Sequence, residues 1–201
     1  MDIVITLDIS GSMRAEDMQP NRAAAAKEVA ERFISGRVSD RIGLVAYAGE
    51  AYTQCPLTLD HNMLVEILRN LDVGAIKADG TAIGMALAEA GTRLKGSHAK
   101  SNVIILITDG VNNTGAIDPK TAAEIIKALG LKAYTIGIGS KEGGRVPMGR
   151  DIFGRIVYSQ EVMELDEDLL KSIAGTTGGK FFLARDSRTL NGVFSEIDRL
   201  E

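Results

Sequence analysis

Polar side chains with oxygen atoms stand at the ends of apolar segments that are predicted to be buried strands. The five side chains in question are Asp8, Ser10, Ser12, Thr81 and Asp109. The first three follow the apolar run Val4–Leu7, Asp109 follows a similar run at Asn102–Ile107, and Thr81 precedes a helical pattern. Because ligands bind outside the carboxyl ends of strands in open α/β sheets, these oxygens converge if the two strands are neighbours.

Two carboxylates and three hydroxyls make a ligand set composed entirely of oxygen. Such a set suits a hard divalent cation, Mg²⁺ above all with Mn²⁺ or Ca²⁺ as alternatives, rather than zinc or copper. The only two histidines, His61 and His98, lack a cysteine or a second histidine at ligand spacing. Gly11, between the two serines, is expected to allow a tight turn that aims both hydroxyls at one point.

The elements that must position these residues alternate between strand and helix patterns, which predicts an α/β fold. The expected strands are Val4–Leu7, Arg41–Ala48, Ala51–Leu57, Asn102–Ile107, Leu131–Ile138 and Lys180–Leu183. The expected helices are Asn21–Ile34, one capped by Asp60 and ending at Leu71, Ala82–Leu94 opened by Thr81, Pro119–Leu129, Asp168–Ala174 and Thr189–Leu200. Right-handed crossovers then give a doubly wound, mostly parallel six-stranded sheet with helices on both faces.

Two segments depart from the parallel alternation. Ala51–Leu57 directly follows another strand, so it is expected to be an antiparallel edge strand. The glycine-rich stretch Gly143–Gln160 contains two short apolar runs, Val146–Met148 and Ile156–Tyr158, and predicts a β-hairpin inserted near residues 146–158.

Length and composition favour one domain over residues 1–201, because 45% hydrophobic content in 201 residues supports one sizeable core. The net charge of −4 is spread along the chain without a basic stripe, which argues against nucleic acid as a partner. Cys55 is the only cysteine, so an internal disulfide is excluded. No run approaches the roughly 18 apolar residues of a membrane span. The first strand lies so close to Met1 that we expect a domain excised from a longer protein.

The motifs resemble the metal-ion-dependent adhesion site of von Willebrand factor type A (VWA) domains. The matching residues are Asp8-x-Ser10-x-Ser12, Asp79-Gly80-Thr81 and Thr108-Asp109-Gly110. Within that superfamily the chain is similar to bacterial aerotolerance-operon proteins of the BatA type, through the segments 15–22, 49–58 and 176–182 and the predicted hairpin. The resemblance covers nearly the whole chain and implies the Rossmann-like VWA fold.

The resemblance also implies a function, which is recognition of a protein partner without catalysis. Ser10, Ser12 and Thr81 would supply hydroxyl ligands to a divalent cation, and Asp8 and Asp109 would act directly or through water. A partner's Asp or Glu would complete the coordination. The implied parent protein is anchored in the bacterial inner membrane by flanking segments, with this domain on the periplasmic side. Its implied partners are other aerotolerance-operon proteins and a MoxR-type ATPase, and its last helix, Thr189–Leu200, would move with metal coordination.

Other interpretations of the same residues remain open. Asp8 could be the nucleophile of a Mg²⁺-dependent phosphatase of the haloacid-dehalogenase-like type, although Ser10 stands where such enzymes have a second aspartate. A bound metal could serve only as a structural scaffold for the loops. Taken singly, the site residues could be turn or capping residues, and the acids at 166–168 could be a second metal site or helix caps. The hairpin could form a wall of the site or pack elsewhere.

Overall fold

The strands of this protein form two separate sheets in a computed structural model that describes residues 1–140, 143–161 and 165–200. The six-stranded sheet has the order β3-β2-β1-β4-β5-β8. Its strands are β1 (Asp2–Asp8), β2 (Arg41–Tyr47), β3 (Ala51–Thr58), β4 (Asn102–Thr108), β5 (Lys132–Ile138) and β8 (Phe181–Ala184). The two-stranded sheet consists of β6 (Gly144–Arg150) and β7 (Ile156–Glu161).

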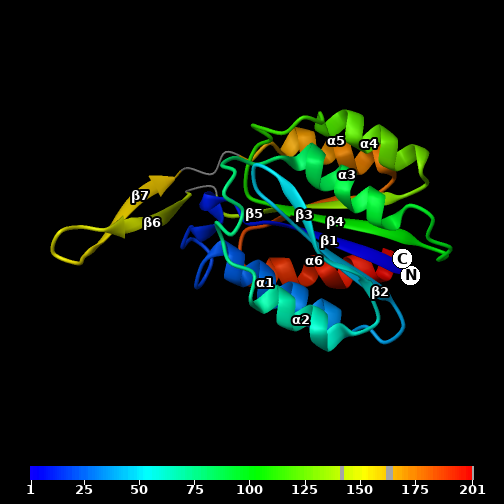
Figure 1. Ribbon diagram of the computed structural model, residues 1–201, viewed down its shortest axis with the longest axis horizontal. Coiled ribbons are helices and arrows are strands. Elements are labelled where there is room, and N and C mark those ends of the chain that lie inside the picture. Colours follow the sequence, from blue (N-terminus) through cyan, green and yellow to red (C-terminus); the bar gives the residue numbers. More distant parts are fainter. Residues whose placement is uncertain (141–142, 162–164, 201) are drawn as a thin grey trace.

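The helices cover both faces of the six-stranded sheet (Figure 1). They are α1 (Arg22–Ser35), α2 (His61–Arg69), α3 (Ile83–Leu94), α4 (Pro119–Ala128), α5 (Glu167–Thr177) and α6 (Ser187–Leu200). A short 3₁₀ helix, η1 (Gly11–Arg14), follows β1. One core cluster joins the sheet to α1, α2 and α6, and the other joins it to α3, α4 and α5.

The strand pairing confirms the predicted fold class. β1 pairs in parallel with β2 and β4, and β4, β5 and β8 continue the sheet in parallel on the far side. β3 pairs with β2 alone and is antiparallel, as expected for a strand that returns directly. Burial on both faces explains why apolar and polar residues do not alternate along β1. Ile3, Ile5 and Leu7 enter one core cluster, while Val4 enters the other.

Helix ends differ from expectation by a few residues where capping decides them. The helix expected to end at Leu71 ends at Arg69, because Asn70 is its C-cap. α5 extends to Thr177, beyond the expected Ala174, because Gly178 terminates it in the left-handed conformation with φ of 76°. α3 begins at Ile83 with Ala82 as its N-cap, so Thr81 lies just before the helix rather than capping it.

The predicted hairpin is present as β6 and β7, which pair antiparallel with each other. Its base contacts η1 and the segment after it, where the Glu16 amide donates to the Arg145 carbonyl at 3.1 Å. From there the hairpin projects away from the body of the molecule, at the opposite end from both termini (Figure 1). It therefore extends outward from the carboxyl ends of the parallel strands instead of folding back over the sheet.

None of the helices in the described ranges combines the length and the apolar character required to cross a membrane.

Candidate metal centre

Asp8 and Asp109 lie side by side because their strands are neighbours at the point where the strand order reverses. Leu7 of β1 pairs with Ile107 of β4, so the next residues of both strands meet at the carboxyl end of the sheet. The Thr108 hydroxyl donates to Asp8 Oδ2 at 2.7 Å, and the Ser10 amide donates to Asp8 Oδ1 at 2.9 Å. Asp8 is fully buried and is held through both of its oxygens.

The two serine hydroxyls connect this end of β1 to Asp109. The Ser12 hydroxyl donates to Asp109 Oδ1 at 2.8 Å, and the Ser10 and Ser12 hydroxyl oxygens are 3.1 Å apart. Gly11 does not act as expected, because its φ is not positive and a Cβ added there would meet nothing within 4 Å. The turn depends on η1, whose 3₁₀ geometry places Ser12 over Asp109.

Thr81 lies next to this cluster on the loop before α3. Its amide donates to Asn113 Oδ1 at 2.8 Å, and its carbonyl accepts from the Asn113 amide at 3.2 Å. A Cβ added to Gly110 would lie 3.6 Å from the Thr81 hydroxyl oxygen, which places that hydroxyl beside the turn that carries Asp109. The segment just before Thr81 passes close to Gly49, where a Cβ would overlap the carbonyl oxygens of residues 78 and 79. The position of the Thr81 loop therefore requires glycine there.

A buried arginine, Arg22, provides the positive charge next to the cluster. It was not among the predicted site residues. Its Nη1 donates to Asp109 Oδ2 at 2.8 Å, and its Nε and Nη2 each donate to Asp17 at 2.8 Å. Asp17 Oδ2 also accepts from the Ser140 amide at 2.7 Å. A cation in the first turn of a helix opposes the helix dipole, and this unusual placement is the feature of the sequence that could have indicated a nearby carboxylate.

The electrostatics of the cluster are dominated by burial of the two carboxylates. Burial, and next the charge of Asp109, raise the pKa of Asp8 to about 7. Burial also raises the pKa of Asp109, while Arg22 opposes that shift. Arg22 contacts Asp109 and Asp17, so Asp8 has no cationic partner in direct contact among the described residues. A hard divalent cation fits this cluster, which offers two carboxylates and three nearby hydroxyls. It would also compensate the negative charge of Asp8.

The raised pKa of Asp8 predicts that the metal-free protein loses stability as pH rises from 4 to 8. An unfolded aspartate has its ordinary pKa of 3.8, so the folded state binds an extra proton between that value and about 7. Stabilisation from this proton is fully present below the unfolded pKa and is lost as pH rises through the folded pKa. We expect a decline of about 4 kcal/mol across this range, since each pKa unit corresponds to about 1.4 kcal/mol.

Urea unfolding at several pH values, with chelator present, would measure this decline. The matched variant is Asp8→Asn, which keeps an acceptor for the Ser10 amide but cannot ionise. Its unfolding free energy should fall less steeply with pH than that of the wild type, because Asp109 is then the only one of the two buried carboxylates that still titrates. An equally steep decline in Asp8→Asn would show that the titrating group is not Asp8.

Among the acids at 166–168, one caps a helix and the other two, Glu167 and Asp168, lie in the first turn of α5, as the capping interpretation expects. Asp166 is the N-cap of α5 and accepts from the Leu169 amide at 2.9 Å. In the part of the chain that the structure describes, no group of three or more His, Cys, Asp or Glu side chains is arranged to hold a metal. The candidate centre at the β1 and β4 ends therefore relies on hydroxyls as well as on two carboxylates.

Comparison with solved structures gives matches over the whole chain. An aerotolerance-related membrane protein from Bacteroides fragilis is 29% identical, with a TM-score of 0.83 over 99% of this chain and 97% of that chain. The conserved hypothetical protein BatB from Bacteroides thetaiotaomicron is also 29% identical, with a TM-score of 0.84 over 100% of this chain and 98% of that chain. The predicted resemblance to aerotolerance-operon proteins is thereby confirmed. Proximal thread matrix protein 1 of the mussel byssus has been solved with zinc in its metal-ion-dependent adhesion site (MIDAS) motif. It is 20% identical to this chain, with a TM-score of 0.75 over 99% of this chain and 45% of that chain, and it shares the fold.

Several sequence relatives are longer than this chain. An uncharacterized protein of Borreliella burgdorferi is 34% identical over 100% of this chain and 58% of its own length. A UPF0353 protein of Mycolicibacterium paratuberculosis is 32% identical over 98% of this chain and 59% of its own length. The chain thus spans about three fifths of these curated relatives. The sequence profile of the von Willebrand factor type A domain matches residues 2–196, and the chain therefore belongs to the VWA domain family.

Proposed function

We propose that this protein is a metal-ion-dependent interaction module that binds a carboxylate of a protein partner through a divalent cation. The observation that carries the proposal is the hydrogen-bonded cluster of Asp8, Ser10, Ser12 and Asp109 at the carboxyl ends of β1 and β4. The mussel protein supports it to the extent that a protein with this fold has been solved with zinc, a divalent cation, in its MIDAS motif.

The proposed ligands are the five predicted side chains. Ser10, Ser12 and Thr81 supply neutral oxygens, and Asp8 and Asp109 bind directly or through water. Mg²⁺ is the proposed ion, with Mn²⁺ or Ca²⁺ as alternatives, because the donors are all oxygen. When bound next to neutral ligands, such an ion retains positive charge that attracts an Asp or Glu of the partner. The exposed position of Gly11 leaves the serine side of the centre open to that partner.

The geometry does not favour the phosphatase alternative. Asp8 is 0% exposed, and its two oxygens accept from the Thr108 hydroxyl and the Ser10 amide. A nucleophilic carboxylate must bond directly to its substrate, which the burial of Asp8 prevents, whereas Asp8 can hold a cation through a bridging water. We therefore propose binding without catalysis.

The wider setting of this domain is also part of the proposal. We propose that residues 1–201 form one VWA domain of a longer protein anchored in the bacterial inner membrane, with the domain in the periplasm. Two observations support this: one solved neighbour is described as an aerotolerance-related membrane protein, and the sequence relatives are longer than this chain. The proposed partners are other aerotolerance-operon proteins and a MoxR-type ATPase.

A carboxylate probe distinguishes an interaction site from a metal that only holds the loops together. We expect acetate at millimolar concentration to lower the water-proton relaxation enhancement of the Mn²⁺-loaded protein, because a carboxylate displaces exchangeable water. A purely structural site, with its coordination completed by the protein, predicts no change on adding acetate.

Thr81→Ala is the matched variant for the same question. Loss of one neutral ligand should weaken Mn²⁺ and Mg²⁺ binding by about 10-fold or more, since even outer-sphere partners of a metal contribute on that scale. The metal-free variant should unfold within about 1 kcal/mol of the wild type, because the bonds found for Thr81 among the described residues are made by its backbone amide and carbonyl, which the substitution keeps. Collapse of the metal-free variant would instead favour the scaffold alternative.

A further inference from the structure

The tip of the β6–β7 hairpin displays two large apolar side chains to solvent. Ile152 is 93% exposed and Phe153 is 77% exposed. Their turn is held by Asp151, whose Oδ1 accepts from the Phe153 amide at 2.8 Å and from the Arg155 amide at 2.9 Å. Gly154 completes the turn with φ of 76°. The apolar tip is therefore presented on a preorganised turn, which lowers the entropy lost on binding.

Two arginines flank this tip. Arg150 donates from Nη1 to the Gly154 carbonyl at 2.8 Å, and the Arg155 guanidinium lies 5.9 Å from the centroid of the Phe153 ring. Neither arginine belongs to an ion pair within residues 1–140, 143–161 and 165–200. The hairpin tip thus combines exposed apolar area with two positive charges.

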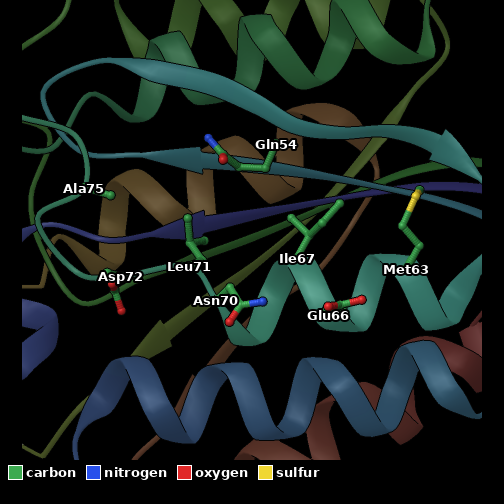
Figure 2. A pocket seen from close by; sticks show the side chains of 8 residues that line it. All are labelled: Gln54, Met63, Glu66, Ile67, Asn70, Leu71, Asp72 and Ala75. Carbon is green, nitrogen blue, oxygen red and sulfur yellow. The ribbon is translucent and has the colours of Figure 1, made fainter.

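A groove of matching character lies between β3 and α2. Figure 2 shows Met63, Ile67 and Leu71 pointing toward β3 from α2 and from the segment that follows it. Met63 and Ile67 lie one turn apart on α2 and form an apolar row along the groove, and Leu71, a core residue that is 7% exposed, closes the end of that row. The hollow has a volume of about 440 Å³, and a second one of about 610 Å³ shares Leu71 and continues toward Ile76. We call this hollow the β3–α2 groove.

Acidic side chains line the same groove. Glu66 and Asp72 are both exposed and both line it, as Figure 2 shows. No ion pair found in the described part of the chain involves either of them. Across the two hollows the lining holds three acids, Glu50, Glu66 and Asp72, against one lysine, Lys77. The net charge of the groove is therefore opposite in sign to that of the two arginines at the hairpin tip.

We propose that the hairpin tip of one copy of this chain docks in the β3–α2 groove of a second copy. Ile152 and Phe153 cover the apolar row, while Arg150 and Arg155 approach Glu66 and Asp72. The tip projects away from its own body, so the contact is made between molecules (Figure 1). Because hairpin and groove are different surfaces, the contact is head-to-tail and builds rings or open chains. It goes beyond the proposed function and requires no metal.

Sedimentation velocity of the purified chain in chelator, from micromolar to millimolar concentration, tests the proposal. We expect reversible, concentration-dependent association that weakens as salt rises, because the paired charges are exposed. The hairpin variant Ile152→Ser with Phe153→Ser, and the groove variant Glu66→Lys with Asp72→Lys, should each weaken self-association at least tenfold. All four positions are exposed or at the rim, so both variants should fold. The control, Val38→Ser, removes a side chain that is 94% exposed and should associate like the wild type.

Mixing the two variants gives the decisive result. The hairpin variant retains an intact groove and the groove variant retains an intact hairpin, so the mixture should form 1:1 dimers and nothing larger. A wild type that stays monomeric, or a mixture that stays monomeric, would overturn the proposal. A wild type that stays monomeric and binds phosphatidylserine vesicles through its hairpin, rather than a second copy, would also overturn the proposal. Because these measurements are made without metal, failure of the metal-site proposal would not affect them.

Discussion

Replacing Asp109 with Ala is expected to abolish Mg²⁺ and Mn²⁺ binding by the chelator-treated protein. Asp109 is one of only two carboxylates in the cluster, and it links the Ser12 hydroxyl to Arg22. Outer-sphere partners of metals contribute about 10- to 100-fold to affinity, so loss of a carboxylate ligand should exceed that range. Isothermal titration calorimetry of each ion into wild type and variant measures the loss directly.

The matched control is Asp168→Ala, which removes an exposed acid from the first turn of α5, remote from the centre in the sequence and on another element. Its metal affinity should equal that of the wild type. The ions should also raise the thermal unfolding temperature of the wild type and of Asp168→Ala, because ligands that bind only the folded state stabilise it. Undiminished binding to Asp109→Ala would contradict the proposed ligand set.

Replacing Arg22 with Ala is expected to destabilise the metal-free protein by about 3–5 kcal/mol at pH 7, the cost of removing one partner from a buried ion pair. The side chains of Arg22 and Asp109 are 2% and 0% exposed. Without the guanidinium, the buried side chains of Asp109 and Asp17 lose their cationic partner. Urea unfolding in chelator would measure the effect.

Two comparisons separate the buried charge from general damage. Arg14→Ala removes an exposed arginine of η1 that donates to the Val73 carbonyl, and should cost less than about 1 kcal/mol. In addition, Mg²⁺ should stabilise Arg22→Ala more than it stabilises the wild type, because the variant has an uncompensated buried carboxylate at the site. Equal costs for the two arginine variants would show that the Arg22 ion pairs contribute little.

Arg22 also connects the centre to the base of the hairpin. Asp17 accepts from both Arg22 and the Ser140 amide, and Ser140 is the second residue after the end of β5. On the other side of this contact, a Cβ added to Gly144 would lie 3.0 Å from the Ala15 Cβ and from Asp17. The candidate centre and the start of β6 are thus held against the same short segment of the chain.

Much of this architecture was determined by local patterns in the sequence. The unbroken apolar runs of β1 and β4 indicated strands buried on both faces, and the structure buries them between two helical layers. The immediate return of Ala51–Leu57 indicated an antiparallel edge. Asp8 and Asp109 were placed together correctly because the carboxyl ends of neighbouring parallel strands share one edge of the sheet.

Tertiary structure alone decided the remaining features. Burial of Arg22 depends on Asp17 and Asp109, and the latter is 87 positions away along the chain. Thr81 is positioned by Asn113 rather than by the start of its own helix. The outward course of the hairpin and the opposite charges of its tip and the β3–α2 groove depend on how distant segments pack. Local propensity and periodicity act over a few residues, whereas the pairing of charges and the shape of a surface depend on contacts across the whole fold.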